Sequence, residues 1–204
     1  KKDEKKIVGG KNGYGAKLAN IFSESFTIYT VDRIEEKKYS QTWENNMTNC
    51  HKPKLKKYSG KPFTTISYDL DFKRFGIEKY SDDLLNLMYR RVYDIAGITD
   101  KSVNVFLNNE KIKIKSFLDY VKMFSTNTDK KIIHEKISDR WEICLTSSDN
   151  DVFEQTSFVN GIHTSQGGSH VDFITKMISN HLMETIKKKH KKEIPDKIIK
   201  RYLS

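Results

Sequence analysis

The sequence from Gly9 to Ser23 reads GGKNGYGAKLANIFS, and this stretch decides how the rest of the chain is interpreted. Its glycines let the backbone adopt positive φ angles and approach a ligand closely. Apolar residues then recur at helical spacing, which predicts a short helix over 16–22. The stretch therefore predicts a glycine-rich loop that leads directly into a helix.

This loop is suited to bind phosphate. The N–H groups at a helix N-terminus favour an anion, and Lys11 and Lys17 would add charged donors. The P-loop pattern does not fit, because Gly15 is followed by Ala16 and not by lysine. The Rossmann pattern does not fit either, because its glycines have the reverse spacing. A tight turn that only caps the helix is the alternative, and the loop residues leave it open.

Length and composition set the class of protein. The chain has 204 residues, 36% of them hydrophobic and 11% aromatic, enough for one large domain or two small ones with a real core. Two cysteines, Cys50 and Cys144, are too few for a disulfide framework or a four-ligand zinc site. No apolar run approaches the roughly 18 residues of a membrane span, so no membrane partner is expected. The chain begins with Lys1 and not with Met, which predicts a fragment.

The net charge of +10 is unevenly distributed. The tail from Ile186 to Ser204 carries eight Lys or Arg and two acidic residues, and residues 1–11 carry five Lys and two acidic residues. The remainder is close to neutral. Basic charge at the two ends predicts anionic partners, such as a nucleotide or a nucleic acid.

Hydrophobic periodicity predicts a mixed α+β fold with a domain boundary in the polar stretch 125–131. The segment 45–62 is expected to be a loop, as is 160–169, and Asn108-Asn109 is expected to form a hairpin turn. Gly97 is expected to end the second helix. Strands are expected over 26–31, 39–44, 64–68, 140–146 and 152–159, and helices over 81–96, 116–124 and from His170 to the lysine-rich tail.

Three motifs together resemble one protein family. The stretch from Gly9 to Ser23 resembles the phosphate-lid segment of eukaryotic-type DNA topoisomerase II, and its G-x-x-G-x-G spacing resembles the third nucleotide motif of the GHKL ATPases. The string SFVNGIHTSQGGSHV, from Ser157 to Val171, resembles the start of the transducer domain in type IIA topoisomerases. The string MYRRVYDIAG, over 88–97, is also similar to the family.

The resemblance implies a fold and a domain organisation. Residues 1–128 would form the C-terminal portion of a GHKL (Bergerat) α/β sandwich. Residues 129–204 would form the N-terminal portion of a ribosomal-S5-like transducer domain. The overall class would be α+β.

The resemblance also implies that ATP is the cofactor of the glycine loop. Thr64 would contact the adenine through water, although a strand threonine without a ligand is an equally good interpretation of that residue. The residues that would bind the nucleotide are Gly10, Lys11, Asn12, Gly13, Tyr14, Gly15, Ala16, Lys17 and Thr64.

The sequence departs from the family pattern in one important respect. The family's general base is a Glu four residues before an Asn that binds Mg²⁺, and no Glu in this chain has that spacing. The D-x-G-x-G motif that holds adenine is also absent. Both are expected before Lys1, and the lysine that senses the γ-phosphate is expected after Ser204. We therefore expect no catalytic residue and no metal ligand in this chain.

The lysine-rich tail matches a family segment that faces DNA. The resemblance assigns Lys187, Lys188 and Lys189 to contact with duplex DNA. A solvated helix end without a partner is the alternative, because cations also complement the C-terminal helix dipole.

The family implies a function for the parent protein. That protein would be a nuclear, homodimeric, ATP-dependent DNA topoisomerase, with this chain in its ATP-operated gate. Two alternatives remain: a non-catalytic nucleic-acid-binding module, or another GHKL ATPase such as a mismatch-repair protein or a chaperone.

Overall fold

The computed structural model describes residues 9, 10, 12–124 and 130–204, and these form two compact units. The sheet unit comprises Gly10–Asp82, and the helical unit comprises Gly9 and Asp83–Ser204. The predicted domain boundary at residue 128 lies outside the described residues and stays a prediction.

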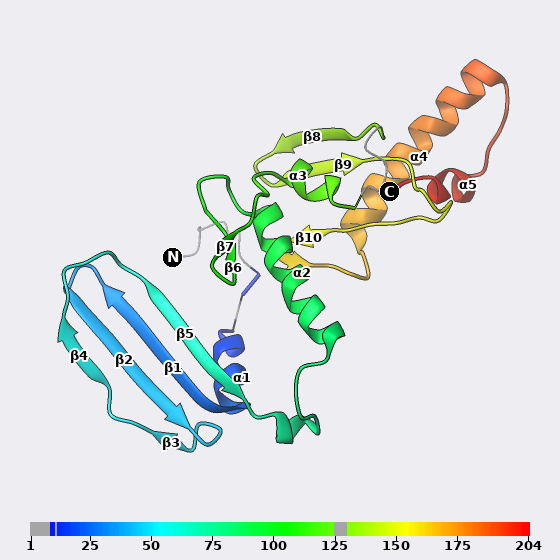
Figure 1. The fold of residues 1–204 in the computed structure, drawn as a ribbon. Helices are drawn as coiled ribbons and strands as arrows, with labels where there is room; N and C mark the ends of the chain where they lie inside the picture. The colour runs from blue at the N-terminus through cyan, green and yellow to red at the C-terminus, as the bar shows by residue number, and fades with distance from the viewer. Residues whose placement is uncertain (1–8, 11, 125–129) are drawn as a thin grey trace. The chain divides into compact units, whose positions relative to one another are not determined.

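The sheet unit is an antiparallel sheet with the α-helix α1 and a short 3-10 helix (Figure 1). The strand order is β3-β2-β1-β5, and β4 also pairs with β2. Helix α1 contacts β1 and β5, and Phe26 of β1 is the main buried side chain of the sheet. The elements are α1 (Tyr14–Ile21), β1 (Ser23–Asp32), β2 (Lys37–Glu44), β3 (Asn49–Cys50), β4 (Lys54–Lys57), β5 (Thr64–Leu70) and the 3-10 helix η1 (Phe72–Phe75).

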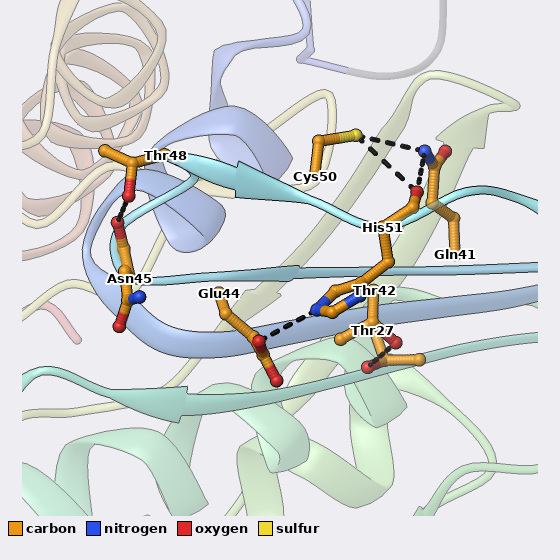
Figure 2. Close-up of polar contacts among 8 residues, drawn as sticks. All are labelled: Thr27, Gln41, Thr42, Glu44, Asn45, Thr48, Cys50 and His51. Carbon is orange, nitrogen blue, oxygen red and sulfur yellow. Dashed lines mark hydrogen bonds and ion pairs between the residues drawn. The ribbon is translucent and has the colours of Figure 1, made fainter.

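The predicted loop over 45–62 is wrong in part, because it contains the edge strands β3 and β4. All four residues of β4 are exposed, so the strand has no alternation of buried and exposed residues that a sequence pattern could reveal. It forms through backbone pairing with β2. At β3, the Gln41 amide donates to Cys50 Sγ at 3.2 Å and to the His51 carbonyl at 2.9 Å, and His51 pairs with Glu44 at 2.8 Å (Figure 2).

The helical unit combines helices with three two-stranded hairpins (Figure 1). The predicted turn at Asn108-Asn109 is confirmed, since both residues have positive φ between β6 and β7. The predicted strand over 152–159 is reduced to its last two residues, and β8, β11 and α5 were not predicted. The elements are α2 (Asp82–Ile98), β6 (Phe106–Leu107), β7 (Glu110–Lys111), α3 (Phe117–Lys122), β8 (Ile133–Ser138), β9 (Trp141–Leu145), β10 (Phe158–Val159), β11 (Ile162–His163), α4 (Ser169–His190) and α5 (Asp196–Arg201).

Gly97 does not end the second helix as predicted. It is buried inside α2, which continues to Ile98, and a methyl group at this position would lie 2.5 Å from Cγ of Tyr120. Tyr120, on α3, is itself only 2% exposed. The glycine is therefore explained by the close approach of α3 and not by a helix terminus.

The long C-terminal helix α4 has the predicted amphipathic face. The residues expected on that face are all partly buried, and Thr175 and Ser179 beside them are buried. Helix α5 packs on α4, with Ile199 5% exposed. Within the described part of the chain, no helix is both long enough and apolar enough to cross a bilayer. The face comprises Val171, Ile174, Ile178, Leu182, Thr185 and Ile186.

The contact at Gly97 gives a test of the packing. The Gly97→Ala substitution should lower the free energy of unfolding by about 1–3 kcal/mol, because the added methyl overpacks the site. Gly15→Ala is the control: its methyl meets no neighbour within 4 Å, and alanine should stabilise helix α1 by about 0.5–1 kcal/mol. Urea unfolding measures both, and a Gly97→Ala chain as stable as the wild type would contradict this packing.

Candidate functional site

The glycine loop leads directly into α1, and the N-terminus of this helix has no side-chain cap. Gly13 is the N-cap and has the left-handed conformation, with φ of 67°, which favours glycine. No side chain caps the helix, and its first turn carries no acidic residue. The first N–H groups of an α-helix have no partners within the helix. This arrangement therefore presents backbone donors and a positive dipole end to an anion.

The surface around this N-terminus is accessible. Apart from chain neighbours, methyl groups at Gly10, Gly13 and Gly15 would meet no atom of the described residues within 4 Å, so a ligand could approach the backbone closely. Lys17 lies on α1 and is exposed. The structure thus brings most of the predicted loop residues into one exposed segment, and Lys11 lies outside the described residues. The exposed members are Gly10, Asn12, Gly13, Tyr14, Gly15, Ala16 and Lys17.

Thr64 lies in a different part of the sheet unit. It begins β5 and pairs with Thr30, with 2.8 Å between the two hydroxyl oxygens. Thr30 is near the end of β1 that lies farther from α1 in the chain. This hydroxyl pair lies outside the glycine loop, and the role of Thr64 toward adenine stays a prediction.

Gly9, at the start of the loop, is anchored by a contact that the sequence analysis missed. Its N–H donates to the carbonyl oxygen of Asn160 at 2.8 Å, in the turn between β10 and β11. A methyl group at Gly9 would lie 2.2 Å from Cδ1 of Ile162. The first and last of the three motifs therefore meet at this residue. Periodicity cannot reveal such a contact between segments far apart in the chain, but the joint presence of the motifs is consistent with it.

The middle motif forms a buried polar network. Asp94 is 2% exposed, and it accepts hydrogen bonds from Tyr120 Oη at 2.6 Å and from Arg91 at 2.8 Å. Arg90 Nε lies 3.8 Å from the same carboxylate. Burial and the hydrogen bond to Asp94 raise the pKa of Tyr120, so its hydroxyl stays a proton donor. Arg90 and Arg91 are therefore both ion-paired with Asp94, and the network joins α2 to α3.

The lysine-rich end of α4 is exposed, and one of its three lysines forms an ion pair. Lys187, Lys188 and Lys189 lie in its last turn, where cations complement the helix dipole. Lys187 Nζ lies 2.6 Å from Glu193 Oε1, and this hydrogen bond raises the pKa of Lys187 and lowers that of Glu193. Among the described residues, no carboxylate lies within 4.0 Å of the ammonium groups of Lys188 and Lys189.

Two other basic residues of the tail have structural contacts. Lys200 Nζ lies 4.8 Å from the centre of the Phe153 ring, and Arg201 Nε donates to the Asp151 carbonyl at 3.0 Å. These contacts join α5 to the segment before β10. The cations exposed for a partner are therefore concentrated at the end of α4.

The described residues include no group of three or more His, Cys, Asp or Glu side chains arranged to hold a metal ion. Cys50 and Cys144 are both free thiols, and burial raises the pKa of Cys144 to about 11. At neutral pH this thiol is therefore protonated and unreactive.

Comparison with known proteins places these features in a family. The family model described as DNA gyrase B matches residues 106–202. DNA topoisomerase 2-alpha of Homo sapiens is 46% identical over 195 residues, which cover 93% of this chain and 13% of that protein. DNA topoisomerase 2 of Saccharomyces cerevisiae is 42% identical over 210 residues, 94% of this chain and 15% of that protein. The chain thus spans about a seventh of these relatives.

Solved structures agree with the sequence matches. The ATPase region of Saccharomyces cerevisiae topoisomerase II aligns with a TM-score of 0.89 and 42% identity, over 100% of this chain and 52% of that one. The ATPase and transducer domains of topoisomerase II from Balamuthia mandrillaris align with a TM-score of 0.88 and 33% identity, over 97% of this chain and 51% of that one. The expected fold class, GHKL followed by the start of a transducer, is confirmed. The chain belongs to the type IIA DNA topoisomerase family and corresponds to part of its ATPase region.

Proposed function

We propose that this chain is part of the ATP-operated gate of a eukaryotic-type DNA topoisomerase II. Such an enzyme passes one DNA duplex through a transient double-strand break in another. The parent protein would act as a homodimer in the nucleus. The observation that carries the proposal is the uncapped, glycine-preceded N-terminus of α1, in a chain whose relatives are topoisomerases.

The loop fits the triphosphate of ATP. Backbone N–H groups from Gly10 to Gly15 would donate to the phosphate oxygens, and Lys17 would add a cation. When bound, ATP supplies the phosphoanhydride bond whose hydrolysis resets the gate. The open surface at the three glycines leaves room for this approach.

The chain's own residues account for binding but not for hydrolysis. Its sequence holds no Glu followed four residues later by Asn, the family's pairing of base and Mg²⁺ ligand. We therefore place the base and the Mg²⁺ ligand outside these 204 residues. Positioning by the loop cannot replace a general base and a metal ion.

The 204-residue chain should not hydrolyse ATP. Steady-state phosphate release should equal that of buffer, while a non-hydrolysable ATP analogue should still bind. Lys17→Ala should weaken that binding about 10- to 100-fold, because a charge-assisted hydrogen bond contributes about 1.5–3 kcal/mol.

The control for this experiment is Lys79→Ala, which removes an exposed lysine of the sheet unit outside the loop. Phosphate release above background that persists in the Lys17→Ala chain would contradict the assignment. Analogue binding that is absent while DNA binding is intact would favour the non-catalytic nucleic-acid-binding module.

The end of α4 is proposed to contact duplex DNA through its phosphates. Lys188 and Lys189 are exposed and have no carboxylate partner among the described residues, whereas Lys187 forms an ion pair with Glu193. Lysine contacts of this kind carry no sequence information, and they make affinity strongly dependent on salt.

Replacing Lys187, Lys188 and Lys189 with Gln should lower the slope of log affinity against log salt by up to about 2.7, at about 0.9 per phosphate contact. Glu193→Gln should raise the affinity, because it releases Lys187 from its ion pair. Fluorescence anisotropy with two unrelated duplexes over a series of KCl concentrations measures both effects.

Lys176→Gln, on an exposed position of the same helix, is the matched control and should leave the slope unchanged. A triple variant with the wild-type slope would show that the end of α4 is a solvated helix end.

A further inference from the structure

A strip of lysines follows one edge of the sheet unit. Lys56 of β4 is directly opposite Lys38 of β2, and Lys54 is directly opposite Ser40. Directly opposite residues share a face of a sheet, as do residues two apart in a strand. Lys38, Lys54 and Lys56, here called the lysine strip, therefore lie on one face. The surrounding sequence 45–68 contains five Lys and no Asp or Glu. This segment is therefore strongly basic, although the chain between its two basic ends is close to neutral as a whole.

The lysine strip lacks local neutralisation. Like charges directly opposite each other in an antiparallel pair are destabilising. Among the described residues, no carboxylate lies within 4.0 Å of the ammonium groups of the strip. The Lys38 ammonium instead lies over the rings of Tyr29 and Phe63, at 5.5 and 5.4 Å.

On the opposite face of the same edge, the lysine pair has carboxylates beside it. There Lys37 is directly opposite Lys57, but Lys37 Nζ lies 3.0 Å from Glu35 Oε2 and Asp32 is its opposite residue on β1. Among the described residues, carboxylates therefore compensate one of the two lysine pairs, whereas the other pair has no carboxylate within 4.0 Å.

Protection of the sheet edge does not explain the strip. Lysines on an edge strand do prevent edge-to-edge association. That role requires charge only on β4, whereas Lys38 lies on β2, which is paired on both sides by β1 and β4. Two facing cations, Lys56 within the acid-free segment 45–68 and Lys38 directly opposite it, favour an anionic partner.

We propose that the lysine strip binds the phosphate backbone of duplex DNA, as a contact additional to the end of α4. Lys54 and Lys56 are separated by two residues of strand, about 6.8 Å, since each residue advances about 3.4 Å. Successive phosphates of one DNA strand advance about 3.4 Å along the helix axis and also turn around it, so they lie roughly 6–7 Å apart and the two lysines match adjacent phosphates. The choice of DNA over other polyanions rests on the proposed function.

The surface next to the lysine strip is also positively charged. A solvent-open hollow of about 490 Å³ lies where the β1–β2 turn meets the segment after β4. Two cations, Arg33 and Lys61, and one carboxylate, Glu36, line it with Tyr58. Its net positive charge continues the basic surface beyond β4.

The test is DNA affinity of the whole 204-residue chain over a series of KCl concentrations. The double variant Lys54→Gln/Lys56→Gln should lower the salt slope by about 1.8, at about 0.9 per contact. The double variant Lys73→Gln/Lys79→Gln, which removes two exposed lysines of the same unit, should keep the wild-type slope.

Stability provides a second readout. Lys56→Gln should raise the urea midpoint, because it removes the cation opposite Lys38, and Lys54→Gln, opposite Ser40, should raise it less. A Lys56→Gln midpoint at or below that of the wild type would contradict the repulsion on which the inference depends.

The outcomes separate this inference from the proposed function. A wild-type slope in the Lys54→Gln/Lys56→Gln chain, with a reduced slope in the variant at Lys187–Lys189, would contradict DNA binding by the lysine strip and support DNA binding by the end of α4. The reverse result would support DNA binding by the strip and contradict DNA binding by the end of α4. Binding of polyglutamate that requires Lys54 and Lys56, with unaffected DNA binding, overturns the choice of DNA.

Discussion

The start of helix α1 is the constraint on which the candidate nucleotide site depends. An α-helix begins with N–H groups that have no internal partner, and soluble proteins usually satisfy them with a side-chain cap. Here the N-cap is Gly13 in the left-handed conformation, which supplies no side chain. The helix therefore keeps its donors and its positive dipole end available, with Lys17 exposed nearby. Within the helical unit, the N–H of Gly9 is anchored to the carbonyl oxygen of Asn160.

The helical unit depends on a different kind of contact. Asp94 is buried, and it is stabilised there by Tyr120 and Arg91, which satisfy its carboxylate oxygens. Gly97, one turn further along α2, allows the Tyr120 ring to approach the helix backbone. The two features together explain why the motif around Arg90–Gly97 combines charged residues with a glycine inside a helix.

Local chemistry explains which parts of the fold the sequence could predict. The strands β1, β2 and β5 contain β-branched and aromatic residues, the helices α2, α3 and α4 have apolar residues at helical spacing, and all six were predicted with boundaries a few residues in error. Strand β4 could not be predicted, because Lys54–Lys57 contains three lysines and no β-branched or aromatic residue, and it forms by pairing with β2. Gly97 was misinterpreted because its role is set by Tyr120, a residue on another helix. The glycine loop was recognised from its spacing, whereas the Gly9–Asn160 contact is tertiary.

The central claim is that the first turn of α1 receives the phosphates of ATP. Amide hydrogen exchange of the chain, with and without a saturating non-hydrolysable ATP analogue, tests it most directly, because the proposed ligands include the backbone N–H groups themselves. Slower exchange is expected at the amides from Tyr14 to Lys17, with little change along β4. Unchanged exchange in this turn at saturating analogue would contradict it.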